Sequence, residues 1–139
     1  MKSKKPILLV EDDQVDVMTV KRALKDIHVT NKLDIAVNGA EALEFLRNSK
    51  KEKPCIILLD LDMPKMNGIE FLKIVKQDER LRRIPVVILT TSEEEQDMVN
   101  SFNLGVAGYM LKPVGYHQFV ETARAIDLYW TLSKLPEEG

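Results

Sequence analysis

The sequence is poor in the residues that support several classes of protein. A single cysteine, Cys55, stands among 139 residues, which excludes an internal disulfide and a zinc site built from several thiolates. The formal net charge is only -2, so no overall positive field attracts nucleic acid or acidic lipid. No apolar run approaches the length of a membrane-spanning helix, and the run after the basic residues 1–5 is too short for a signal peptide. We therefore expect a cytoplasmic protein with no nucleic-acid or membrane partner.

The composition and length of the chain suit one soluble domain. The chain is 45% hydrophobic and 30% charged, as in ordinary globular proteins, and its length allows a sizeable core. The one local basic cluster comprises Arg80, Arg82 and Arg83, which we interpret as a solvated loop. We expect residues 1–139 to form a single domain.

Short apolar runs alternate with helical patterns along the whole chain. The runs occupy residues 6–10, 32–37, 55–59, 85–89 and 107–111, and the helical patterns occupy residues 14–26, 40–48, 68–77, 93–103 and 116–133. This alternation predicts an α/β fold with a parallel sheet and helices on both faces. The commonest five-stranded arrangement is the flavodoxin-like order 2-1-3-4-5.

Two of the predicted strands end in carboxylates. Residues 7–10 run into Glu11-Asp12-Asp13, and residues 55–59 run into Asp60. In the predicted order these are strands 1 and 3, which flank the switch point where ligands bind. Two like charges 4 Å apart repel by about 4 kcal/mol at an effective dielectric near 20, so converging carboxylates favour a bound cation. Mg²⁺ prefers oxygen ligands and commonly joins one or two carboxylates to a phosphate.

The neighbouring strand ends carry groups that suit a phosphoryl ligand. The fourth strand ends in Thr90-Thr91-Ser92, which offers hydroxyls, and the fifth ends before Lys112, which offers an ammonium. A carboxylate, a divalent cation, a hydroxyl and a lysine could together hold a phosphoryl group and stabilise its developing charge. The sequence therefore indicates phosphoryl transfer rather than storage of a structural metal.

An ordered set of four motifs resembles the response-regulator receiver domains of two-component signalling. The motifs are Val10-Glu11-Asp12, Leu59-Asp60-Leu61-Asp62-Met63-Pro64, Leu89-Thr90-Thr91 and Leu111-Lys112-Pro113. Each is weak alone, but each closes a predicted strand, and the resemblance covers about residues 5–127. The C-terminal extension, with Asp127-Leu128-Tyr129-Trp130 and Leu135-Pro136, resembles the small single-domain regulators that are paired with bacterial phytochromes.

The resemblance implies roles for the acidic residues. Asp60 would accept the phosphoryl group from a phosphohistidine of a sensor histidine kinase. Asp12 would bind Mg²⁺ directly, Glu11 through water, and Asp62 through its backbone carbonyl. Three consecutive acids leave the register open by one residue; we take Glu11 and Asp12, which directly follow the strand, and expect Asp13 to cap the first helix.

The resemblance to receiver domains also implies roles for three residues at the fourth and fifth strands. Thr90 would move to donate a hydrogen bond to the phosphoryl group, and Lys112 would pair with Asp60 and then with that group. Tyr109 would be the switch aromatic that turns inward when Thr90 moves. Taken singly, each has an ordinary alternative: a strand-end threonine, a surface lysine and a core tyrosine.

The resulting prediction is a stand-alone response regulator that catalyses only its own phosphorylation and dephosphorylation. It would signal to an unnamed protein target, and could form a homodimer through residues 93–103, 107–111 and 116–133. A phosphorelay intermediate shares every motif and remains open. A haloacid-dehalogenase-type phosphatase is a third alternative because of Asp60-Leu61-Asp62, but Pro64 interrupts that motif and the chain lacks room for a substrate-covering cap.

Overall fold

A computed structural model describes residues 5–26, 30–61, 68–90 and 93–111, together with residues 117 and 121. Five strands form one sheet in the order β2-β1-β3-β4-β5, and all four pairings are parallel. The strands are β1 (Ile7–Val10), β2 (Leu33–Ala36), β3 (Ile56–Asp60), β4 (Val86–Thr90) and β5 (Gly108–Leu111). The helices are α1 (Gln14–Asp26), α2 (Gly39–Arg47), α3 (Gly68–Gln77) and α4 (Glu93–Ser101).

This arrangement confirms the predicted flavodoxin-like fold and its strand order. Every described strand and helix overlaps the run or pattern that predicted it, with ends that differ by no more than two residues. The predicted fifth helix, residues 116–133, lies mostly outside the described residues. Among the described helices, none has the length and apolar character needed to span a membrane.

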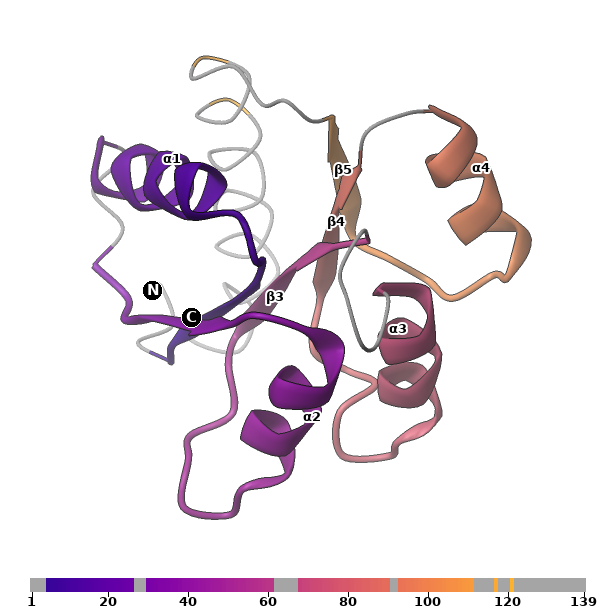
Figure 1. The fold of residues 1–139 in the computed structure, drawn as a ribbon. Helices are drawn as coiled ribbons and strands as arrows, with labels where there is room; N and C mark the ends of the chain where they lie inside the picture. Colours follow the sequence, from indigo (N-terminus) through magenta and orange to yellow (C-terminus); the bar gives the residue numbers. More distant parts are fainter. Residues whose placement is uncertain are drawn as a thin grey trace, which may run out of the picture.

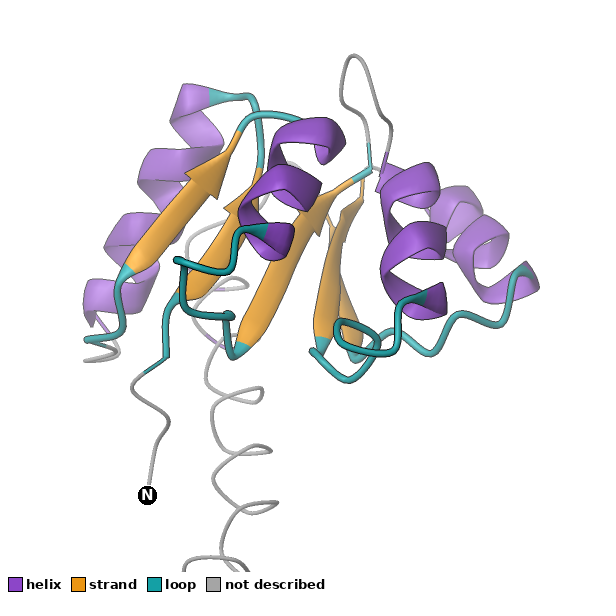
Figure 2. Cartoon of the chain, turned by 90° about the horizontal axis from the view of Figure 1, so that it is seen from below, coloured by secondary structure: helices purple, strands orange, loops and turns teal. Residues whose placement is uncertain are grey.

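Helices cover both faces of the sheet (Figures 1 and 2). On one face, α1 packs Val17, Val20 and Ala23 against side chains of β1, β3, β4 and β5. On the other face, α2, α3 and α4 pack against the alternate side chains of β1, β3 and β4. The spacing of Val17, Val20 and Leu24 predicts that Leu24 faces the core. Instead Ala23 is fully buried and Leu24 only partly buried, because α1 is rotated slightly from that prediction.

The register of β1 and β3 places their carboxyl ends side by side at one edge of the sheet. Val10 pairs with Leu59, so the next residues along β1 and β3 are Glu11 and Asp60. Both central strands are buried along their whole length, as expected for strands covered on both faces. The carboxyl edge of the sheet therefore holds acidic side chains at the end of an otherwise apolar core.

Candidate functional site

Three carboxylates meet at the carboxyl ends of β1 and β3. One carboxylate oxygen from each of Glu11, Asp12 and Asp60 lies within 4.8 Å of the others. Glu11 and Asp60 are buried, with 1% and 2% of their surface exposed, whereas Asp12 is exposed. Hard oxygen donors at this spacing fit a small divalent cation, and the exposed side of the cluster gives such an ion access from solvent. The structure thus brings together three of the predicted site residues.

Asp13, the third of the consecutive acids, caps the N-terminus of α1. Its Oδ1 accepts hydrogen bonds from the backbone N–H of Val15 at 2.8 Å and of Asp16 at 3.2 Å. These bonds satisfy two N–H groups at the start of α1, which confirms the predicted cap. The backbone N–H of Asp13 donates in turn to Glu11 Oε2 at 3.2 Å, so the same turn helps to orient the Glu11 carboxylate.

Thr90 lies at the end of β4 and is 1% exposed. Its Oγ1 donates a hydrogen bond to Oε1 of Glu95, in the first turn of α4, at 2.5 Å. Thr90 is one of the predicted site residues. For Glu95 the sequence predicts only a capping role, because Ser92 and Glu95 have the spacing of a capping box. Ser92 lies outside the described residues, so that capping prediction stays untested.

Tyr109 on β5 is half-buried and reaches the far end of α4. Its hydroxyl donates to Oδ1 of Asn100 at 2.5 Å. Burial raises the pKa of the Tyr109 hydroxyl, and the negative charge of Asp97 raises it further. Asn100 was not predicted, because nothing local in the sequence links it to a residue nine positions later.

Gly68 allows α3 to begin close to the end of β3. A Cβ at this position would lie 2.6 Å from Leu61 Cα and 2.8 Å from the carbonyl oxygen of Asp60, distances that no side chain tolerates without a backbone shift. The Gly68 N–H donates to the Leu61 carbonyl at 3.0 Å.

The two predicted site residues not yet placed, Asp62 and Lys112, lie outside the described residues.

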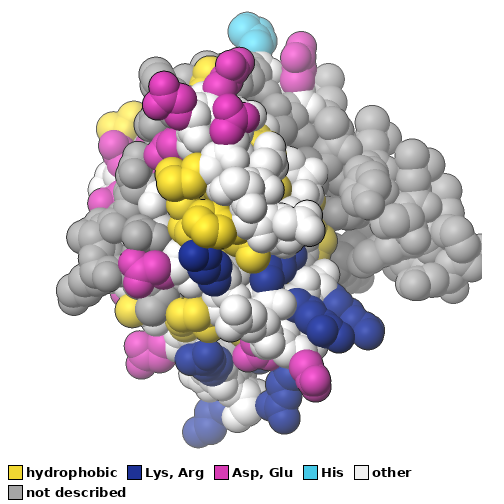
Figure 3. All heavy atoms as spheres, turned by 90° about the vertical axis from the view of Figure 1, so that its right-hand side faces the viewer, with side chains coloured by type: hydrophobic (Ala, Val, Ile, Leu, Met, Phe, Trp, Pro, Cys, Tyr) yellow, Lys and Arg dark blue, Asp and Glu magenta, His cyan; other side chains and the backbone are white. Residues whose placement is uncertain are grey.

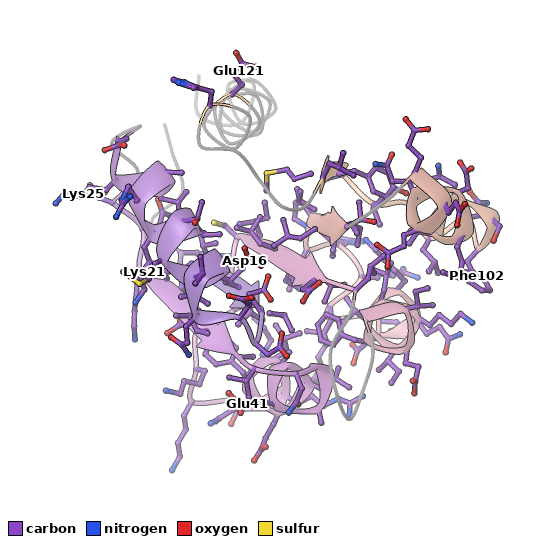
Figure 4. The ribbon with its side chains drawn as sticks, turned by 45° about the horizontal axis from the view of Figure 1, so that its top comes forward. Asp16, Lys21, Lys25, Glu41, Phe102 and Glu121 are labelled. Carbon is purple, nitrogen blue, oxygen red and sulfur yellow. The ribbon has the colours of Figure 1, made fainter. Side chains whose placement is uncertain are left out.

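Apolar side chains gather on the face formed by α3 and α4, with acidic groups at one end of that face and basic groups toward the other (Figure 3). The exposed apolar residues of this region are Met98 and Phe102, at 46% and 42% exposure. Lys73 of α3 places its Nζ 3.9 Å from the centre of the Phe102 ring, a cation–π contact. Figure 4 shows that Phe102, beside α4, and Asp16 of α1 lie on opposite sides of the sheet.

Comparison with known proteins identifies the family. A family model described as the response regulator receiver domain matches residues 7–124. The chain is 38% identical over 130 residues to response regulator Rcp1 of Synechocystis sp., a match that covers 91% of this chain and 88% of Rcp1. It is 37% identical over 127 residues to the probable methanogenesis regulatory protein FilR2 of Methanothrix harundinacea, covering 89% of this chain and 82% of FilR2.

Solved structures of other response regulators, two of them named as phytochrome response regulators, have the same fold. The bacteriophytochrome response regulator RtBRR gives a TM-score of 0.80 at 44% identity, covering 88% of this chain and 77% of that one. Mn²⁺-bound Rcp1 gives 0.77 at 38% identity, covering 91% and 94%. The phosphorylated cyanobacterial phytochrome response regulator RcpA gives 0.78 at 36% identity, covering 93% and 95%. The predicted resemblance to these regulators is confirmed, and the chain belongs to the family of response regulator receiver domains.

Proposed function

We propose that this chain is a stand-alone two-component response regulator that acts in the cytoplasm. It accepts a phosphoryl group on Asp60 from a sensor histidine kinase and signals by binding a protein partner. The observation that carries the proposal is the meeting of Glu11, Asp12 and Asp60 at the carboxyl edge of the sheet. In an α/β sheet this edge, at the switch point between β1 and β3, is where ligands bind.

Mg²⁺ is the cation that best fits a phosphoryl-transfer role for this cluster. Asp12 and Asp60 would hold it directly, Glu11 through water, and Asp62 through its backbone carbonyl. Bound there, the ion would neutralise the carboxylates and the oxygens of the incoming phosphoryl group. Two observations support a divalent ion: the three carboxylates lie within 4.8 Å of one another, and the similar protein Rcp1 has been solved with Mn²⁺ bound.

The acceptor step follows from the position of Asp60. A carboxylate oxygen of Asp60 attacks the phosphorus of the kinase phosphohistidine, the phosphorus–nitrogen bond breaks, and its electron pair returns to the imidazole. Lys112 and Thr90 then hold the phosphoryl oxygens, and Tyr109 changes its position in response. Support comes from the buried Thr90 hydroxyl at the end of the neighbouring strand and from the phosphorylated state of the similar protein RcpA.

The similarity to bacteriophytochrome regulators supports a phytochrome-type kinase as the donor. For the output, we propose a homodimer that forms through α4, β5 and the predicted helix at residues 116–133. Met98, Phe102 and Leu111 expose apolar surface on this side of the chain, and such surface suits a protein contact. Sedimentation with and without a phosphoryl donor tests this: a dimer that strengthens on phosphorylation supports the proposal, and an unchanged monomer contradicts it.

The acceptor assignment is tested by labelling with acetyl phosphate and Mg²⁺, followed by intact-mass measurement. We expect the wild-type chain to gain one phosphoryl group, Asp60→Asn to gain none, and a chelator to abolish labelling. Asp13→Asn is the matched control, because it removes a neighbouring negative charge while asparagine still caps α1. Labelling of Asp60→Asn to the wild-type level would overturn the proposal.

The alternative outputs are separated by two further assays. Transfer of the label from Asp60 to a histidine phosphotransfer protein would identify a phosphorelay intermediate. Multiple turnover of a generic phosphate ester would favour a phosphatase, although the match to the receiver family over residues 7–124 favours the regulator.

A further inference from the structure

Helix α4 is held to the sheet by little apolar contact. Among the residues of α4, Val99 alone is buried, while Met98 is 46% exposed. Helix α1, in contrast, buries Val17, Val20 and Ala23. Because burial of apolar side chains supplies most of the free energy that fixes a helix in place, α4 depends to an unusual degree on its polar contacts.

Two of those polar contacts are made to the residues that change position in the proposed function. Near the start of α4, Glu95 accepts the hydrogen bond of Thr90 at 2.5 Å. At its far end, Asn100 accepts the hydrogen bond of Tyr109, also at 2.5 Å. The first contact joins a buried hydroxyl to a carboxylate, and hydrogen bonds to charged groups are about twice as strong as neutral ones.

The Thr90 hydroxyl cannot serve Glu95 and a phosphoryl group at once. A threonine hydroxyl carries one hydrogen, and in the structure it is directed at the Glu95 carboxylate. Alternate residues of a strand also point to opposite faces: Thr90 shares the face of Ile88, which α2, α3 and α4 cover, whereas Asp60 shares the face of Leu58, which α1 covers. Thr90 must leave Glu95 before it can donate to a group on Asp60.

We propose that Glu95 is a positioning residue that holds Thr90 in the resting state and so opposes the phosphorylated state. This inference rests on the proposed function of Asp60. Glu95 stabilises the resting state, in which Thr90 is held away from Asp60. A phosphoryl group or its analogue needs the other state, so its apparent affinity is the intrinsic affinity multiplied by the fraction of chains in that other state. Phosphorylation releases Glu95 from Thr90, which loosens the N-terminal attachment of α4 and couples the acceptor site to the face that carries Met98.

The test measures the affinity of beryllofluoride, a phosphoryl analogue, at saturating Mg²⁺ by calorimetry. Glu95→Gln keeps the shape of the side chain but replaces a charged acceptor by a neutral one. We expect it to bind beryllofluoride about threefold to thirtyfold more tightly than wild type, from the difference between charged and neutral hydrogen bonds. Glu94→Gln is the matched control, since Glu94 is exposed in the same turn and loses the same charge; its affinity should equal that of wild type.

A second pair of variants distinguishes an effect of Glu95 through its hydrogen bond with Thr90 from a general effect of Glu95 on α4. In a Thr90→Val background, which lacks the hydroxyl, Glu95→Gln should change the affinity no further. Equal affinities for wild type and Glu95→Gln, or a gain that persists in the Thr90→Val background, would overturn the inference while leaving Asp60 as the acceptor. Failure of the wild type itself to bind beryllofluoride would overturn both this inference and the proposed function.

Discussion

Replacing Asp12 with asparagine should stabilise the ion-free protein and remove its response to Mg²⁺. The carboxylate oxygens of Glu11, Asp12 and Asp60 lie within 4.8 Å of one another. At that separation two unit charges repel by about 3.5 kcal/mol at an effective dielectric of 20. Asparagine keeps the size and hydrogen-bonding capacity of the side chain, so the substitution removes charge with little change in packing.

The expected gain is smaller than the unscreened value. Asp12 is exposed, so solvent screens both of its pairs, and exposed ion pairs contribute about 1 kcal/mol or less each. We expect the free energy of unfolding of Asp12→Asn to exceed that of wild type by about 1–2 kcal/mol without divalent ions, a rise of about 3–8 °C in Tm. With Mg²⁺ at 100 times its Kd, the wild type should gain about 2.7 kcal/mol, and the order of stability should reverse.

Thermal unfolding in chelator and in a Mg²⁺ series gives both quantities from one preparation. Asp13→Asn is the control, because it removes a neighbouring charge outside the cluster and should keep the full Mg²⁺ shift. An Asp12→Asn protein that is less stable than wild type in chelator, or that keeps the wild-type Mg²⁺ shift, would show that this carboxylate does not belong to a repulsive, ion-binding cluster.

Two further predictions concern packing and titration. Gly68→Ala should lower the free energy of unfolding by about 1–3 kcal/mol and slow phosphorylation, because its Cβ would lie 2.6 Å from Leu61 Cα; denaturant unfolding that matches wild type would contradict the close approach. The Tyr109 hydroxyl has a pKa raised above its usual 10.0, so its contribution to stability is complete below about pH 10 and is lost as the pH rises through the folded-state value. Ultraviolet titration of wild type against Tyr109→Phe should show this late ionisation, and Asp97→Asn should lower that pKa only partly, because burial is the larger cause; an ordinary pKa in wild type would refute the assignment.

Much of the fold was predictable because its signals are local or repeat along the chain. The apolar runs of β1 and β3 end at Glu11 and Asp60, and topology rules alone place those two ends side by side. The capping role of Asp13 also followed from the sequence, since it needs only the N–H groups two and three residues later.

The contacts of α4 were not predictable, because they depend on how distant elements pack. Glu95 fits a capping box with Ser92 equally well on local spacing, and only the placement of α4 against β4 brings it to Thr90. Asn100 and Tyr109 meet across the turn between α4 and β5. In the same way, small rotations of α1 decide that Ala23, rather than its larger neighbour, is the residue fully buried.

An anomalous difference map from crystals of this chain grown with Mn²⁺ would show directly whether the three carboxylates bind a divalent ion. We expect one strong peak at the ends of β1 and β3, bounded by the carboxylates of Asp12 and Asp60 with Glu11 one water away. A peak elsewhere on the chain, or none at the three carboxylates at saturating Mn²⁺, would contradict this expectation.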